Sequence, residues 1–316
     1  MPPKKLTGLV PQAYEHPSDA AALNALQHTV GLDLLVRKLN EWGFERFVRV
    51  QLTGSYLRVN SDNFPDLHGI LTAACDVLDL PLQPDLYVAP GPINAFTAGV
   101  TRPLIVVTSG TIDILAPEEL LFVIAHEVGH IKSGHVFYYQ IAEFLPQIGE
   151  AIGAVTFGIG EMVFAGLNLA LLHYKRMAEF TADRAGLLAC QDAEVAFRTM
   201  MKLAGLPSKY CGTVNTADFI AQAREFQQLD TDAISRVAKW LSVLAASHPW
   251  TVMRAQRLLD WIDAKGYELV VADPKRVAEP ALGVGSRSCR NCNRILSDTA
   301  IFCPYCGLTL GQAVQH

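Results

Sequence analysis

Near the middle of the chain, Ala125–His130 has the sequence Ala-His-Glu-Val-Gly-His. Two helical residues four positions apart lie on the same face about one turn from each other, so the imidazoles of His126 and His130 could bind one tetrahedral metal ion. Glu127 would then lie beside the open coordination position. There a carboxylate can take a proton from a metal-activated water and pass it to a leaving amine. The stretch therefore predicts a zinc site that hydrolyses peptide bonds.

The residues before this stretch favour a helix. Pro117 suits a first helical position, and Glu118 and Glu119 suit the positive end of the helix dipole. Apolar residues then cover a broad face, as a helix buried in a domain core requires. They are Leu120, Leu121, Val123, Ile124, Val128 and Ile131. The alternative interpretation is a core helix with two hydrogen-bonded histidines and no metal.

His135 is a third histidine close to this motif. It lies nine residues from His126, about half a helical circumference around, so it cannot share the metal if the helix continues. We expect the helix to end near Gly134 and His135 to form local hydrogen bonds there.

Two histidines and a water leave one coordination position for the protein to fill. Downstream, Glu179 and Asp183 share one face of a predicted helix, with Arg176 three residues before the glutamate. We expect Glu179 to bind the metal and Asp183 to accept the free N–H of a ligating imidazole, which fixes its tautomer. The alternative is a set of ordinary charged residues on a solvated helix face. The histidine motif upstream favours the metal-ligand interpretation.

Four stretches together resemble the gluzincin peptidases of the HtpX and CaaX prenyl protease type, over roughly residues 56–259. They are His126–His135, Glu179–Asp183, Asn94–Gly99 and Ser247–Pro249. The resemblance implies a mainly helical α+β zincin-type fold with a small mixed sheet, and a Zn²⁺-dependent endopeptidase acting on polypeptides. It also implies an edge strand at Asn94, Ala95 and Phe96, to which substrate adds as a further strand. The local sequence alone is equally compatible with a plain core strand.

The resemblance further implies that His248 faces the metal across the cleft, where its N–H would stabilise the oxyanion of the tetrahedral intermediate. A neutral imidazole there could equally bind zinc and hold the enzyme inactive. Pro249 restricts His248 to an extended conformation, which is typical of a loop, so a structural histidine before a turn is the remaining interpretation. Arg254 either pairs with a carboxylate or caps a helix.

A second metal signal lies near the C-terminal end. Two Cys-x-x-Cys pairs, formed by Cys289, Cys292, Cys303 and Cys306, have the spacing of a structural zinc ribbon. Two disulfides are the alternative, but a chain without a visible signal peptide favours metal. Because a module this short has almost no hydrophobic core, zinc binding must supply most of its folding energy. We expect one catalytic and one structural Zn²⁺ per chain.

At 316 residues and 50% hydrophobic composition, the chain can form one large domain and a small ribbon. We expect the peptidase domain over 1–271, with a helical lead-in over 1–55, a linker over 272–288 and the ribbon over 289–311. The net charge of −5 disfavours a nucleic-acid partner, so we expect the ribbon to contact protein or to regulate. A latent peptidase fold that acts through this ribbon is the alternative function.

Local patterns predict the remaining elements. A helix is expected from Asp19, with Ser18 as its cap. Alternation in Val48–Val59 predicts a strand pair with Gly54 at the turn. The other expected elements are a helix over Leu32–Trp42, strands over Asp85–Ala89 and Leu104–Val107, and small buried side chains at Cys75, Cys190 and Cys211.

Residues 151–172 contain Glu161 as their only ionisable group and are long enough to span a bilayer. One crossing would separate the two histidines from Glu179, and residues 137–150 are too polar for a second. We therefore expect the interval 137–172 to fold over the cleft as a lid, to lie on a membrane surface, or to be buried in an oligomer. The start of the chain lacks an apolar export segment, which predicts a cytoplasmic protein, with peripheral membrane attachment as the open alternative.

Overall fold

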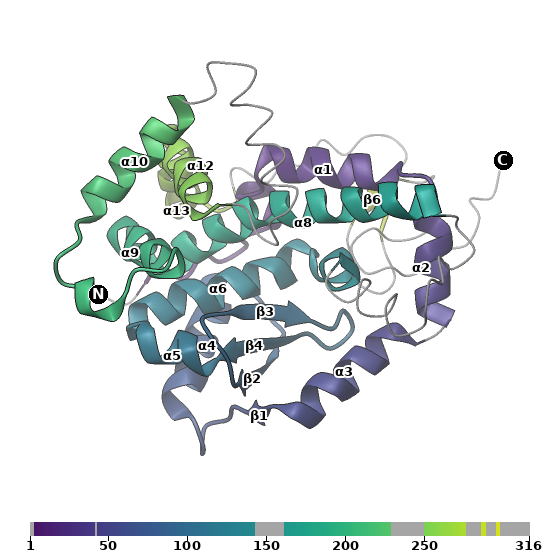
Figure 1. Ribbon diagram of the computed structural model, residues 1–316, viewed down its shortest axis with the longest axis horizontal. Coiled ribbons are helices and arrows are strands. Elements are labelled where there is room, and N and C mark those ends of the chain that lie inside the picture. Colours follow the sequence, from purple (N-terminus) through teal and green to yellow (C-terminus); the bar gives the residue numbers. More distant parts are fainter. Residues whose placement is uncertain are drawn as a thin grey trace.

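The computed structural model describes residues 3–41, 43–142, 161–228, 250–275, 286–288 and 295–297. Within these ranges most of the chain is helical, and the strands form a four-stranded mixed sheet and a separate two-stranded one (Figure 1). The predicted α+β class is therefore confirmed. None of the helices in these ranges combines the length and apolar character that a bilayer crossing requires.

The four-stranded sheet has the order β1-β2-β4-β3. Its strands are β1 (Leu57–Arg58), β2 (Asp85–Ala89), β3 (Ala95–Ala98) and β4 (Leu104–Thr108). The central pair β2 and β4 is parallel, and both outer pairs are antiparallel. The strands expected at Asp85–Ala89 and Leu104–Val107 are thus present. β3 lies at the edge of the sheet, as the resemblance implied for Asn94–Gly99.

Both faces of this sheet are covered. On β4 every residue is buried, and its side chains alternate between two hydrophobic cores. Ile105 and Val107 belong to the core of α4 (Pro65–Val77) and α6 (Pro117–Ser133). Leu104 and Val106 belong to a second core with α1 (Pro17–Gln27), α2 (Leu32–Glu41) and α3 (Phe44–Ser55).

The strand pair predicted over Val48–Val59 is wrong. Most of this segment is α3, and Gly54 lies within the helix rather than at a turn. The buried residues Phe44, Val48 and Leu52 recur every four positions, so they line one helical face. Residues spaced four apart also fit the period of two that predicts a strand. A short apolar pattern of this kind therefore does not distinguish a helix from a strand.

The N-terminal helix also differs in its cap. α1 begins at Pro17, and the Nδ1 atom of His16 accepts a hydrogen bond from the Ser18 N–H at 3.1 Å. Ser18 is therefore inside the helix, not its cap. α2 covers Leu32–Glu41, in agreement with the prediction except at Trp42, which lies outside the described residues.

The site is formed by α6 and the 30-residue helix α8 (Glu161–Cys190), which lie against each other above the sheet (Figure 1). Their close approach requires glycine, because a Cβ at Gly129 would lie 2.5 Å from the Cβ of Ala185. The second half of the predicted apolar interval, from Glu161, is part of α8; residues 143–160 lie outside the described part of the chain. Other helices among the described residues include α5 (Ser109–Ile114), α9 (Ala193–Leu203), α10 (Thr216–Gln228), α12 (Thr251–Asp263) and α13 (Gly266–Ala272).

Near the C-terminal end, β5 (Ser286–Ser288) and β6 (Ile295–Ser297) pair in antiparallel fashion. The four cysteines of the expected zinc ribbon lie outside the described residues, so the ribbon and the domain boundaries stay predictions. Of the other cysteines only Cys75 is buried. The expectation is wrong for Cys190 and Cys211, which are partly exposed because they lie at the ends of helical segments.

Candidate active site

Helix α6 fixes the two histidines of the motif. It begins at Pro117, as predicted, and the Glu119 carboxylate accepts the Ala116 N–H at 2.7 Å. His126 and His130 are both buried, and their Nε2 atoms lie 3.2 Å apart. The spacing of four residues therefore directs both imidazoles to one point.

Helix α8 brings Glu179 to the same point. Its two carboxylate oxygens lie 3.5 Å from His126 Nε2 and 3.4 Å from His130 Nε2. One ligand atom from each of the three buried residues lies within 4.8 Å of the others. Two imidazole nitrogens and a carboxylate oxygen are a donor set that zinc prefers, with a coordination position left over. The residues present therefore fit a zinc ion.

Behind His126 lies a buried ion pair. The His126 Nδ1 is 3.1 Å from Asp183 Oδ1, and the Arg254 Nε donates to Asp183 Oδ2 at 2.8 Å. Arg254 also places Nη1 3.3 Å from Glu179 Oε2, so it pairs with carboxylates rather than capping a helix. Burial alone would raise the pKa of Asp183, but the charges and hydrogen bonds of Arg254 and His126 together outweigh it and lower that pKa. Asp183 is thus an anion that faces His126, the imidazole whose N–H it is expected to accept.

The pKa values of the two imidazoles are shifted in opposite directions from the ordinary value of histidine. Burial lowers the pKa of His130 to about 3, which keeps its ring neutral. Burial also acts to lower the pKa of His126, but the hydrogen bonds with Asp183 and Glu179 and the charges of these carboxylates together outweigh it and raise that pKa to about 9. Glu179 lies equally close to both rings, so the additional carboxylate beside His126, that of Asp183, accounts for the difference.

His135 does not belong to the cluster of three. Helix α6 ends at Ser133, and Gly134 takes a left-handed conformation with φ of 77°, which turns the chain. The His135 Nδ1 then lies 2.9 Å from His130 Nδ1. The prediction that His135 forms hydrogen bonds near the helix end is confirmed.

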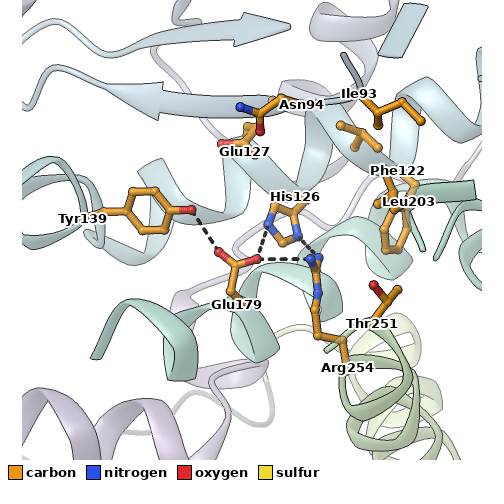
Figure 2. A pocket seen from close by; sticks show the side chains of 12 residues that line it. Ile93, Asn94, Phe122, His126, Glu127, Tyr139, Glu179, Leu203, Thr251 and Arg254 are labelled. Atoms are coloured by element: carbon orange, nitrogen blue, oxygen red, sulfur yellow. Dashed lines mark hydrogen bonds and ion pairs between the residues drawn. The ribbon is translucent and has the colours of Figure 1, made fainter. Parts of the chain in front are cut away.

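Glu127 lines a cleft together with His126 and Glu179 (Figure 2). Burial raises the pKa of its carboxyl to about 7. Sequence reasoning missed Tyr139, which lines the same cleft and donates its Oη–H to Glu179 Oε1 at 3.1 Å. Its only sequence signal was its place shortly after the histidine motif. The cleft is completed by Ile93, Asn94, Ala95, Phe122, Val123, Leu203, Thr251 and Arg254.

The expected substrate strand meets the cleft only in part. Asn94 and Ala95 line it at the start of β3, whereas Phe96 packs against the core of α1–α3 instead. His248 lies outside the described residues, so its predicted oxyanion role is not addressed by the geometry.

Comparison with known proteins gives a consistent result. Residues 61–262 match the family described as Peptidase family M48. The chain is 31% identical over 280 residues to the plastoglobule-localized metallopeptidase 48, chloroplastic, of Arabidopsis thaliana, covering 87% of this chain and 80% of that protein. It is 30% identical over 183 residues to protease HtpX homolog 2 of Methanosarcina mazei, covering 51% of this chain and 62% of the relative. No solved structure gives a significant match.

Proposed function

This chain belongs to peptidase family M48 and is an HtpX-like zinc metallopeptidase, and on that basis we propose that it cleaves internal peptide bonds of polypeptides with Glu127 as general base. One observation carries the proposal. A nitrogen from each of His126 and His130 and an oxygen from Glu179 lie within 4.8 Å of one another, and Glu127 lines the same cleft as His126 and Glu179.

The proposed zinc ligands are His126, His130 and Glu179. Zinc, when bound, supplies Lewis-acid chemistry that polarises a carbonyl and makes a water acidic. Asp183 accepts the Nδ1–H of His126, which leaves Nε2 as the nitrogen that faces the metal position and gives up its proton when metal binds. Tyr139 holds one oxygen of Glu179 in the same way. These contacts hold two of the three proposed ligands, His126 and Glu179, before metal arrives.

Glu127 moves the proton. Its carboxylate takes a proton from the attacking water while the water oxygen forms a bond to the substrate carbonyl carbon. When the C–N bond breaks, Glu127 returns that proton to the leaving amine nitrogen. The side chain is buried, so few water molecules compete for the proton. The resemblance to gluzincins supports His248 as the donor to the oxyanion.

The cleft suggests how a polypeptide binds. β3 is an edge strand, so an extended substrate can pair with its free side, beginning at Asn94 and Ala95. One wall of the cleft is apolar, formed by Ile93, Phe122 and Leu203 (Figure 2). We therefore expect an apolar substrate side chain next to the cleaved bond.

The test is Glu127→Gln in the full chain. Glutamine keeps the shape of the side chain but accepts no proton, so cleavage of casein should fall at least about 100-fold while zinc content is unchanged. Glu118→Gln, an exposed glutamate on the same helix, should retain both and is the matched control. Undiminished cleavage by the Glu127 variant would remove the proposed role.

Metal analysis tests the two predicted zinc sites separately. We expect about two zinc ions per chain, of which His126→Ala removes one and replacement of Cys289 and Cys292 removes the other. An unchanged zinc content in His126→Ala would contradict the catalytic site. An unchanged content in the cysteine variant would contradict the ribbon.

A further inference from the structure

A second buried carboxylate lies behind the other histidine of the motif. Asp19, on α1, is 1% exposed, and its Oδ2 lies 3.0 Å from His135 Nε2. The His135 Nδ1 lies 2.9 Å from His130 Nδ1. Since His130 directs its Nε2 at the metal position, an unbroken series of contacts joins Asp19 to that position through two imidazoles.

The order of protons along this series follows from the chemistry of each atom. A zinc-binding His130 needs the lone pair of Nε2, so its proton is on Nδ1, which donates to His135. His135 must then accept through Nδ1 and carry its own proton on Nε2. That N–H points to Asp19, and an ionised carboxylate is an acceptor only. Asp19 therefore favours the arrangement with the protons on His130 Nδ1 and His135 Nε2 over the opposite tautomers of the two rings.

Asp19 also holds the helix that carries Glu179. The Thr181 Oγ1–H donates to the same Asp19 Oδ2 at 2.6 Å, and Thr181 lies on α8 two residues after Glu179. α1 lies along α8 (Figure 1). A single oxygen of α1 thus contacts His135, which supports one expected ligand, and α8, which carries another.

We propose that Asp19 is a positioning residue of the catalytic metal site, which acts through His135 to hold His130 with its Nε2 facing the zinc. The proposal rests on the proposed function, because it takes His130 as a zinc ligand. Asp19 lies outside residues 61–262, the part of the chain that matches the family. The N-terminal helix is therefore part of the active site of this chain rather than only a cover for its core.

The experiment measures zinc transfer from the full chain to a chromogenic chelator, together with ¹⁵N spectra of the histidines. Asp19→Ala should release the catalytic zinc about 10-fold faster and shift the His130 ring signals away from the Nδ1–H form. Asp19→Asn places a carbonyl oxygen where Oδ2 was, so its release rate should stay within about 3-fold of wild type. His135→Phe keeps the volume and removes both nitrogens, and should match Asp19→Ala. It tests the proposal independently if the alanine variant does not fold.

Leu23→Ala is the control for a merely structural role. Leu23 is buried on the same helix and belongs to a hydrophobic core, not to the series of contacts. It should lower the melting temperature at least as much as Asp19→Ala and leave zinc release unchanged. Three results would overturn the proposal. Leu23→Ala could release zinc as fast as Asp19→Ala, or Asp19→Ala and His135→Phe could both release zinc at the wild-type rate. Asp19→Asn could also release zinc as fast as Asp19→Ala. His126→Ala separates the two hypotheses: if it lowers zinc content while Asp19→Ala has no effect, only the positioning role fails.

Discussion

The two histidines of the motif are supported from behind in different ways. His126 contacts the carboxylate of Asp183 directly, and Arg254 neutralises that carboxylate. His130 reaches its carboxylate, Asp19, only through a second imidazole. We call the first the short support (Asp183 and Arg254) and the second the long support (His135 and Asp19).

The difference shows how the two halves of the site depend on the rest of the protein. The short support lies on α8 and α12, inside the region that matches the family. The long support depends on α1, and each additional hydrogen bond is another place where orientation can be lost. A direct contact with an ion also contributes more than a contact between neutral groups. We therefore expect removal of the short support to cost more than removal of the long one.

Asp183→Ala should have the largest effect. It removes the acceptor for His126 and leaves the buried guanidinium of Arg254 without its main partner, which costs about 3–5 kcal/mol in the free energy of unfolding. Zinc release should accelerate about 100-fold, against about 10-fold for Asp19→Ala. Chelator kinetics and urea unfolding measure the two quantities. Asp113→Ala, an exposed aspartate of α5, should change neither. Slower release from Asp183→Ala than from Asp19→Ala would reverse the comparison.

The short support could be predicted from the sequence, and the reason is local. Glu179 and Asp183 lie four residues apart on one helix, so their relative position follows from helix geometry alone. Once Glu179 was expected at the metal, Asp183 had to lie beside a ligand. The pairing of Arg254 with a carboxylate was one of two interpretations that its position allowed.

The long support could be predicted only at one end. The end of α6 at Gly134 and the hydrogen bonding of His135 followed from the sequence, but its partner Asp19 did not. Asp19 was expected only as the first residue of a helix. A helical period tells which face of α1 is buried, but not which distant helix covers it. The same ambiguity of short patterns explains why the alternation in Val48–Val59 predicts strands where the structure has α3.

A double variant tests whether the long support acts as one series. Asp19 is expected to influence His130 only through His135, so Asp19→Ala should add less than about 2-fold to the zinc release rate of His135→Phe. The two single variants and the double variant are compared in the chelator assay. Independent, multiplying effects would show that Asp19 reaches the site by another route, for example through Thr181.

Low pH should destabilise the helix that carries Asp19, because His16 caps this helix and becomes protonated. Burial, with the charges of Arg184 and Arg257, lowers the pKa of His16 to about 4, although Asp19 acts in the opposite direction. Between pH 6.5 and 4 the unfolded chain therefore binds a proton that the folded chain does not, so stability falls as the pH is lowered through this window. We expect a loss of roughly 1–3 kcal/mol in the free energy of unfolding, measured by urea unfolding across this range.

His16→Asn is the matched variant for this effect. Protonation of His16 would remove the Nδ1 acceptor of the Ser18 N–H, whereas asparagine is a good helix cap and does not titrate. The variant should have near wild-type stability at pH 7 and a smaller loss between pH 6.5 and 4. An identical pH dependence in the two proteins would assign the acid sensitivity to other groups.

The smallest effect is expected at Thr181, where the long support meets α8. Thr181→Val removes one of the donors to Asp19 and leaves the His16 N–H without its acceptor, which Thr181 Oγ1 provides at 3.0 Å. The His135 contact to Asp19 remains, so zinc release should rise only about 3-fold, and the free energy of unfolding should fall by about 1 kcal/mol. Thr181→Ser keeps the hydroxyl and should restore both values. A release rate in Thr181→Val as high as that of Asp19→Ala would mean that the carboxylate acts mainly by holding α8, and that the contact with His135 is secondary.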